Sequence, residues 1–217
     1  AFLRGDEAEV YIRTLLARWD IQNIKTILRG KNIHADPIEI AECLVPAGDL
    51  DETVLTELIR QPDVRAVIDL MATWGIEYAT PLTRRFGEFI EQRDLSILEY
   101  ALDMFYYKNA LQTVKEGSYN DRILEEMIRT EIDVTNIKTI LKMLRDRMDV
   151  EDAGKYLIPG GIALDAGRMH SMLTAGTIEG AVKHLEPTPY AFLARAPEDA
   201  LRGDRISPLE KWLDNYL

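Results

Sequence analysis

Apolar residues spaced three and four positions apart follow two long stretches of the sequence. The first stretch extends from Glu7 to about Arg29, and the second, from Ile123 to about Arg147, shows the spacing more fully. Such spacing places the apolar side chains on one face of a helix. We therefore predict two long helices, the first ending at Gly30, since glycine readily adopts the left-handed conformation that closes many helices.

Shorter helices are predicted after each long one. Aspartates at positions 36, 51 and 165 stand where an N-cap side chain would accept a backbone N–H of the first helical turn. No segment alternates over the length of a strand, so the predicted fold class is all-α. The predicted short helices are 37–44, 53–60, 64–73, 81–92 and 95–115, then 150–157, 167–173, 177–185 and a short segment at 190–195.

The centre of the first long helix is repeated in the second. Residues 23–28 read Asn-Ile-Lys-Thr-Ile-Leu, and residues 136–141 read the same six amino acids. A chance match of this length is expected in about one in 1000 chains of this size. Further matches at the same offset extend from Val10 and Ile123 to Pro46 and Pro159. The sequence thus predicts duplicated helical domains.

A second repeated pattern, Leu-Glu-x-x-Leu-Asp, occurs at 98–103 and again at 209–214. Its first occurrence precedes the second long helix. We therefore predict a first unit over 1–93, a second over 94–206 and the start of a truncated third over 207–217. The first unit lacks the segment before its long helix, so we expect the chain to be a piece of a longer protein.

Composition narrows the classes of function. The 217 residues are 47% hydrophobic and carry a net charge of −11, from 37 acidic and 26 basic residues. A nucleic-acid-binding protein normally shows a basic patch, so we expect no nucleic-acid partner. A single cysteine, Cys43, excludes an internal disulfide. No apolar run has the length that a membrane-spanning helix needs.

Four polar residues of the repeated stretch are candidate contacts for a cavity or a partner: Asn23, Lys25, Asn136 and Lys138. Asparagine is unfavourable inside a helix, so its presence in both copies requires a reason. One interpretation is a polar surface that faces a partner or a central cavity. The other is structural, with each asparagine bonding to a neighbouring loop that its unit needs.

Motifs for catalysis are missing from the sequence. His34, His170 and His184 do not stand at the spacing of metal ligands, and neither a phosphate-binding loop nor a nucleophile elbow is present. The pair Tyr106-Tyr107 is interpreted as core packing. We predict no catalytic, cofactor-binding or metal-binding residue, and hence a protein that is not an enzyme.

The repeated helix resembles a known family. Residues 19–31 and 131–141, which share the pattern Asp-x-x-Asn-Ile-Lys-x-Ile-Leu, and the Leu-x-Pro-x-Gly breaks at 44–48 and 157–161 are similar to those of the C subunit of archaeal and bacterial A/V-type ATPases. The d subunit of the eukaryotic vacuolar proton pump is a relative of that family. The second copy departs from the first at Lys142-Met143, where Arg29-Gly30 stands in the first.

This resemblance implies a mechanical role. It implies three helical units around a pseudo-threefold axis, forming a funnel, with the third unit missing or truncated here. The expected function is a non-catalytic central-stalk (rotor) subunit that couples the rotor shaft to the membrane proteolipid ring, in support of proton or sodium transport. Its expected partners are the shaft subunits and the ring, with no cofactor and no nucleotide bound directly. The expected location is peripheral, at the cytoplasmic face of the cell membrane.

Two other classes of function stay open at this point. A helical-repeat adaptor unrelated to the rotary ATPases would stack its units into an open superhelix, although repeats of that kind usually span 20 to 50 residues. An all-α enzyme would require a cluster of ionisable residues in one pocket.

Overall fold

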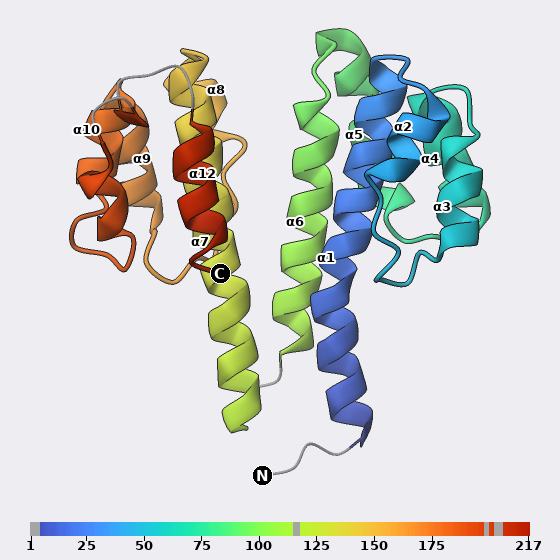
Figure 1. Ribbon diagram of the computed structural model, residues 1–217, viewed down its shortest axis with the longest axis horizontal. Coiled ribbons are helices and arrows are strands. Elements are labelled where there is room, and N and C mark those ends of the chain that lie inside the picture. The colour runs from blue at the N-terminus through green and yellow to red at the C-terminus, as the bar shows by residue number, and fades with distance from the viewer. Residues whose placement is uncertain (1–4, 115–117, 198–199, 202–205) are drawn as a thin grey trace. The chain divides into compact units, whose positions relative to one another are not determined.

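The computed structural model describes residues 5–114, 118–197, 200–201 and 206–217, and within them every regular element is a helix (Figure 1). These described residues contain no β-strand, which confirms the all-α prediction. The chain forms two compact units, Ala1–Lys115 and Glu116–Leu217, called unit 1 and unit 2 below. The repeat boundaries at 93/94 and 206/207 concern the duplication and stay a prediction.

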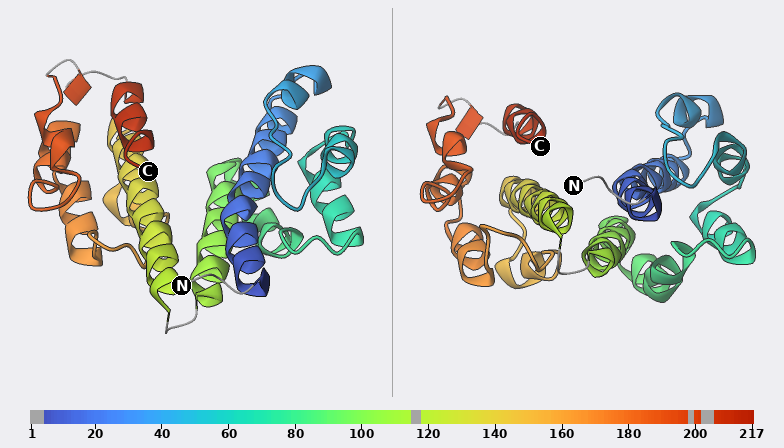
Figure 2. Two further views of the ribbon diagram at one scale, coloured as in Figure 1. Left: turned by 60° about the horizontal axis from the view of Figure 1, so that its bottom comes forward. Right: turned by 90° about the horizontal axis from the view of Figure 1, so that it is seen from below.

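Unit 1 is organised around two long antiparallel helices, α1 and α6, which lie side by side (Figures 1 and 2). The α5 helix packs on α6, and the short helices α2 to α4 cover the other side of α1. The core between them is apolar and includes Ile24, Leu28 and Leu102, none of which is exposed. The helices are α1 (Gly5–Asn32), α2 (Pro37–Glu42), α3 (Glu52–Ile59), α4 (Val64–Thr73), α5 (Ala79–Gln92) and α6 (Ser96–Thr113).

Unit 2 is organised around the long helix α7, which packs against α9, α10 and α12. Its core continues from Ile137 and Ile140 of α7 to Leu209 and Leu213 of α12. The elements are α7 (Tyr119–Arg145), α8 (Val150–Gly154), α9 (Ala166–Thr174), α10 (Ile178–Lys183), the 3-10 helix η1 (Ala191–Arg195) and α12 (Ser207–Asp214).

The three predicted N-caps are confirmed. Asp36, Asp51 and Asp165 accept hydrogen bonds from the backbone N–H groups of Ile38, Val54 and Arg168, at 2.7 to 2.9 Å. An N-cap acceptor satisfies one of the backbone donors that a helix start leaves free. The helices that these residues cap, α2, α3 and α9, begin within one residue of the predicted positions.

The predicted end of the first long helix at Gly30 is wrong. Helix α1 continues to Asn32, and His34 adopts the left-handed conformation (φ 57°) after it. The glycine at position 30 leaves room for α2, because a Cβ there would lie 2.5 Å from Cδ1 of Ile40. The predicted helices 95–115 and 190–195 correspond to α6 and to η1, and Lys115 lies outside the described residues.

Candidate functional site

A buried aspartate of α1 holds the loop that follows α2. Asp20 has no exposed surface, and its carboxylate accepts hydrogen bonds from the backbone N–H groups of Asp49 (2.9 Å) and Leu50 (3.0 Å). The hydroxyl of Tyr78 donates to the same carboxylate at 3.4 Å. One side chain therefore connects the long helix, the loop before α3 and the start of α5.

An aspartate of α7 has the same role in unit 2. Asp133 is fully buried and accepts the backbone N–H groups of Ile162 (3.2 Å), Ala163 (2.7 Å) and Leu164 (3.1 Å). The hydroxyl of Tyr190 donates to it at 3.2 Å. Asp20 and Asp133 are the residues three positions before the two repeated hexapeptides.

Burial dominates the electrostatics of both carboxylates. It raises the pKa of Asp20 and of Asp133, because an ionised carboxylate loses hydration there, and the backbone N–H donors offset part of this rise. Burial beside these carboxylates also raises the pKa of Tyr78 and of Tyr190, so both phenols remain protonated hydrogen-bond donors. Each carboxylate is thus held by neutral donors, the backbone N–H groups and one tyrosine hydroxyl, as expected of a residue that stabilises the fold.

The two asparagines of the repeated hexapeptide bind the backbone of the loop in their own unit. The amide of Asn23 donates to the carbonyl of Val45 at 2.7 Å and accepts its N–H at 2.9 Å. The amide of Asn136 makes the same pair of bonds with Ile158, at 2.7 and 2.8 Å. Asn23 is 2% exposed and Asn136 is 0% exposed, so these bonds satisfy the two buried amides. Ile158 is buried as well, whereas Val45 is 41% exposed.

Two glycines allow these loops to approach the long helices. A Cβ built on Gly48 would overlap the carboxylate of Asp20, and one built on Gly161 would overlap that of Asp133. These glycines are the last residues of the two Leu-x-Pro-x-Gly breaks. The motif therefore has a physical cause: its second residue pairs with the asparagine, and its last residue leaves room for the aspartate.

The lysine of the hexapeptide forms an ion pair with the neighbouring helix in each unit. In unit 1 the ammonium of Lys25 pairs with the carboxylate of Asp103 in α6. One turn further along α1, the guanidinium of Arg29 binds both carboxylate oxygens of Glu99, at 2.6 and 2.7 Å. Burial raises the pKa of Asp103, and the ammonium of Lys25 opposes that rise.

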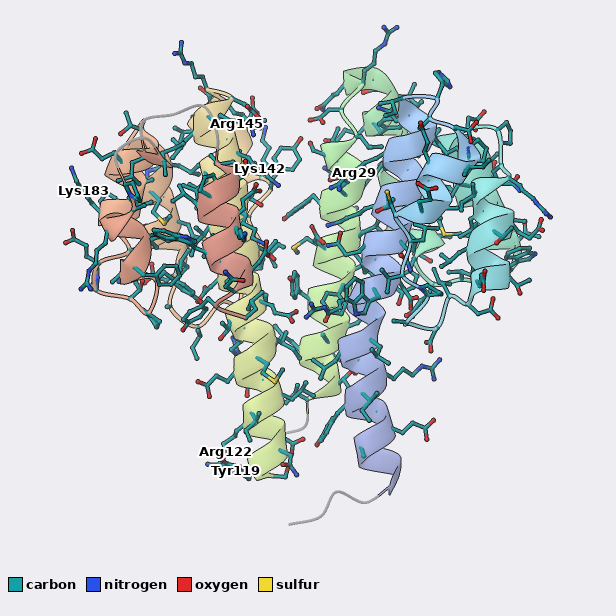
Figure 3. The ribbon with its side chains drawn as sticks, in the orientation of Figure 1. Arg29, Tyr119, Arg122, Lys142, Arg145 and Lys183 are labelled. Carbon is teal, nitrogen blue, oxygen red and sulfur yellow. The ribbon has the colours of Figure 1, made fainter. Side chains whose placement is uncertain are left out.

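In unit 2 the ammonium of Lys138 pairs with the carboxylate of Asp214 in α12, and that of Lys142 lies 3.1 Å from Glu210. Figure 3 labels Arg29 on α1 and Lys142 on α7, the basic members of the two second pairs. The acidic partners are the acids of the repeated pattern Leu-Glu-x-x-Leu-Asp.

All four predicted contact residues, Asn23, Lys25, Asn136 and Lys138, thus bind groups of their own unit. For the asparagines these are the loop contacts of the structural interpretation. A further contact of these residues with a partner or a cavity stays a prediction. Sequence reasoning does not pair Tyr78 and Tyr190 with the aspartates. The two tyrosines are 112 residues apart, close to the offset of 113 between the hexapeptides, and this is the signal that could have identified them.

Apart from these contacts, the part of the chain that the structure describes has few groups that could bind a metal ion or react. His34, His170 and His184 are exposed, and no group of three His, Cys, Asp or Glu side chains that could hold a metal ion occurs there. Tyr106 and Tyr107 are buried in unit 1, as predicted. Cys43 is a free, exposed thiol.

A groove of about 380 Å³ lies between α1 and α6 in unit 1. Its α1 wall includes Val10, Thr14 and Ala17, and its α6 wall includes Asn109 and Ala110. Charged residues also line it, and two of them, Arg13 and Asp49, form an ion pair at 2.7 Å.

Comparison with known proteins identifies the family. The family described as "ATP synthase (C/AC39) subunit" matches residues 1–217, the whole chain. The chain belongs to this family. The membership does not favour the alternative of a helical-repeat adaptor unrelated to the rotary ATPases.

Curated relatives carry the corresponding name. The A-type ATP synthase C subunit of Methanocaldococcus jannaschii is 30% identical over 213 residues, which are 98% of this chain and 53% of that protein. That of Methanosphaera stadtmanae is 29% identical over 204 residues, covering 93% of this chain and 52% of the relative. That of Methanococcoides burtonii is 31% identical over 185 residues, covering 85% and 50%. The chain spans about half the length of the curated relatives it matches.

Family membership agrees with the resemblance read from the repeated helix, and it places the chain among subunits of rotary ATP synthases. Over the described residues, none of the helices has the length and apolar character needed to cross a membrane.

Proposed function

We propose that the chain is part of a non-catalytic central-stalk protein, which couples the rotor shaft to the membrane proteolipid ring of an A/V-type ATP synthase. The observation that carries this proposal is the family match over the whole chain, together with relatives named as the C subunit of the A-type ATP synthase. The coupling supports proton or sodium transport linked to ATP synthesis or hydrolysis on other subunits.

The contacts within each unit suit a part that transmits torque. A coupler must resist twisting, and close-packed helices with satisfied polar contacts are stiff. In unit 1 the residues Asp20, Asn23 and Lys25 fix a loop and the helix α6 to α1. In unit 2 the matched residues fix a loop and α12 to α7. These matched contacts also support the predicted duplication.

The partners in this proposal are the shaft subunits and the proteolipid ring, and the chain is peripheral to the membrane through the ring, at its cytoplasmic face. The net charge of −11 favours basic partner surfaces, since opposite charge speeds association and orients it.

Binding to purified partners tests the proposal. The chain is passed over immobilised shaft subunits, and separately over an immobilised proteolipid ring, from an A-type ATP synthase. We expect retention on at least one of them, decreasing as salt is raised because charge contributes to the contact. An unrelated acidic helical protein of similar size is the control. Equal retention of both proteins, or of neither, contradicts the proposal.

The absence of nucleotide chemistry is tested separately. Calorimetric titration of the isolated chain with ATP and Mg²⁺ is expected to show no binding, and a phosphate-release assay no hydrolysis. Micromolar binding of ATP contradicts the non-catalytic assignment.

A further inference from the structure

The groove between α1 and α6 in unit 1 carries an excess of negative charge around Arg13. The hydrogen bond and the charge of Asp49 raise the pKa of Arg13. Glu9 and Glu77 raise it further, so their carboxylates lie close enough to act on the same guanidinium. Glu77 lines the groove, and its carboxylate forms no ion pair and accepts no hydrogen bond within the described residues. Three negative charges therefore lie near one positive charge, an excess of two.

The walls beside this charge are aromatic and apolar. The rings of Tyr78 and Phe105 both line the groove and stand nearly perpendicular, with 81° between their planes and 6.0 Å between their centroids. Burial raises the pKa of Tyr78, so its phenol stays uncharged. The face of an aromatic ring attracts a cation, and its apolar surface can also cover methylene groups. Val10, Ala17 and Ala110 extend that apolar surface.

The groove is elongated and has the size of a small-molecule site. Its volume of about 380 Å³ falls within the roughly 300–1,000 Å³ that is typical of ligand pockets. Its walls reach from Val10 to Ala17 on α1 and from Phe105 to Thr113 on α6, so it follows the helices for about 10 to 12 Å. Figure 1 shows these two helices extending side by side beyond the short helices α2 to α4. A matching ligand is linear, has an apolar chain and carries more than one positive charge.

Unit 2 has the fold of this region without its acids. In unit 1 Asp49 follows the glycine of the Leu-x-Pro-x-Gly break, whereas Ile162 follows it in unit 2. Glu77 directly precedes the tyrosine that donates to the buried aspartate, and Pro189 has that place in unit 2. The bonds to the buried aspartate occur in both units, so they do not require acidic side chains at these two positions. The acids are therefore available for a role that belongs to unit 1.

We propose that this groove binds a linear polyamine, whose ammonium groups lie against the carboxylates of Glu77 and Asp49. The methylene chain lies along the rings of Tyr78 and Phe105. Charge complementarity carries the proposal, because the acids face a groove whose other walls, Arg13 apart, are neutral. A metal ion would need several oxygen ligands together, and the described residues hold no group of three His, Cys, Asp or Glu side chains placed for one. The proposal goes beyond the coupling role and does not depend on it.

Calorimetric titration of the 217-residue chain with spermidine, a linear triamine, tests the proposal at physiological ionic strength. We expect saturable binding of one molecule per chain. An equal concentration of Mg²⁺ is expected to compete weakly, because this ion retains its water shell and gains nothing from apolar walls.

Two variants with the same change of net charge locate the site. Glu77→Gln is expected to weaken binding about tenfold, because a charge-assisted hydrogen bond to the ligand is lost. The control Glu39→Gln alters an exposed acid of α2 that does not line the groove, and it should weaken binding less than about twofold.

A third variant tests the shape of the groove with every carboxylate in place. Thr14→Phe places a ring between the walls and is expected to weaken binding at least as much as Glu77→Gln does. In NMR spectra of the parent chain, spermidine should shift the ring resonances of Tyr78 and Phe105 and leave those of Phe192 in unit 2 unchanged.

Three results overturn the proposal. The first is the absence of saturable binding. The second is equal weakening by Glu77→Gln and Glu39→Gln, since net charge alone would then attract the amine. The third is full displacement of spermidine by an equal concentration of Mg²⁺. Circular dichroism verifies folding, and the comparison of the two glutamate variants decides the proposal even where Thr14→Phe does not fold.

Discussion

The same hexapeptide lies in different surroundings in the two units. The side chains of Lys25 and Asp103 are 8% and 19% exposed, whereas those of Lys138 and Asp214 are 23% and 60% exposed. The lysines belong to identical segments, so the difference comes from the acidic partner helix. Asp103 lies within α6, and residues of α6 on both sides of it pair with α1 or line the groove beside it. Between the two units the acid differs in exposure more than the lysine does.

The contacts nearer the loops are alike in both units. Asp20 and Asp133 each hold consecutive backbone N–H groups, and Asn23 and Asn136 each bind one residue of the loop. These bonds join residues 22 to 31 positions apart, from the long helix to the loop that follows it. The polar contacts between the long helix and its loop are thus similar in the two units, whereas the ion pairs with α6 and α12 differ in exposure.

The largest effect is expected from removing a buried carboxylate. Asp133→Ala leaves three backbone N–H groups and the hydroxyl of Tyr190 without their acceptor, so unfolding of unit 2 should become easier by about 3–5 kcal/mol. Asp20→Ala should do the same to unit 1. Urea denaturation, with hydrogen exchange resolved by segment, assigns the loss to a unit. The control Asp152→Ala, at an exposed pair with Lys155, should change stability by less than about 0.5 kcal/mol.

A smaller loss is expected for the asparagine. Asn136→Leu removes both bonds to Ile158 and should destabilise unit 2 by about 2–4 kcal/mol, because two buried backbone groups lose their partners. Limited proteolysis should show cleavage in unit 2 while unit 1 stays resistant. Equal loosening of both units would mean that they do not unfold independently.

The two ion pairs should contribute differently to the stability of their units. Lys25→Met strands the carboxylate of Asp103 and should cost about 2 kcal/mol. Lys138→Met, whose partner Asp214 is largely exposed, should cost less than about 1 kcal/mol. Thermal unfolding of both variants under one set of conditions gives the ratio. Similar losses would show that the exposure of the acidic partner does not set the strength of these pairs.

The smallest effect is a dependence on pH. Because the pKa of Asp20 and of Asp133 is raised by burial, each stabilises the fold fully below the unfolded pKa and loses this contribution as pH rises through the folded pKa. These two groups should therefore add to the free energy of unfolding as pH falls from neutral towards their raised values. Urea midpoints across that range, compared with those of Asp133→Asn, measure it. A slope that the variant leaves unchanged would assign the pH dependence to other carboxylates.

Sequence reasoning works best where a structure is local. The caps at Asp36, Asp51 and Asp165 involve donors within three residues, and all three are confirmed. The predicted end of α1 at Gly30 is wrong, since the helix continues to Asn32. Gly30 instead leaves room for the side chain of Ile40 in α2, a neighbour that the pattern alone does not reveal. The bond between Tyr78 and Asp20 spans 58 residues and depends on the packing of α5.

The acidic partners of the lysines could be predicted in part. Asp103 is 78 residues from Lys25, so spacing gives no hint of the ion pair. The repeated acids at 99 and 103, and at 210 and 214, nevertheless stand at nearly the same offset as the repeated basic residues. Reading the two repeats together could have paired them, whereas each repeat alone could not.

The exposed thiol of Cys43 has a practical consequence. It is the single cysteine of the sequence and lies two residues before Val45. The backbone N–H and C=O of Val45 are both hydrogen-bonded to the side chain of Asn23. A maleimide fluorophore would thus attach at one place, next to a firmly anchored loop, without any mutation. Such a label would move with unit 1, and its polarisation in single assembled complexes would test the rotor role proposed above.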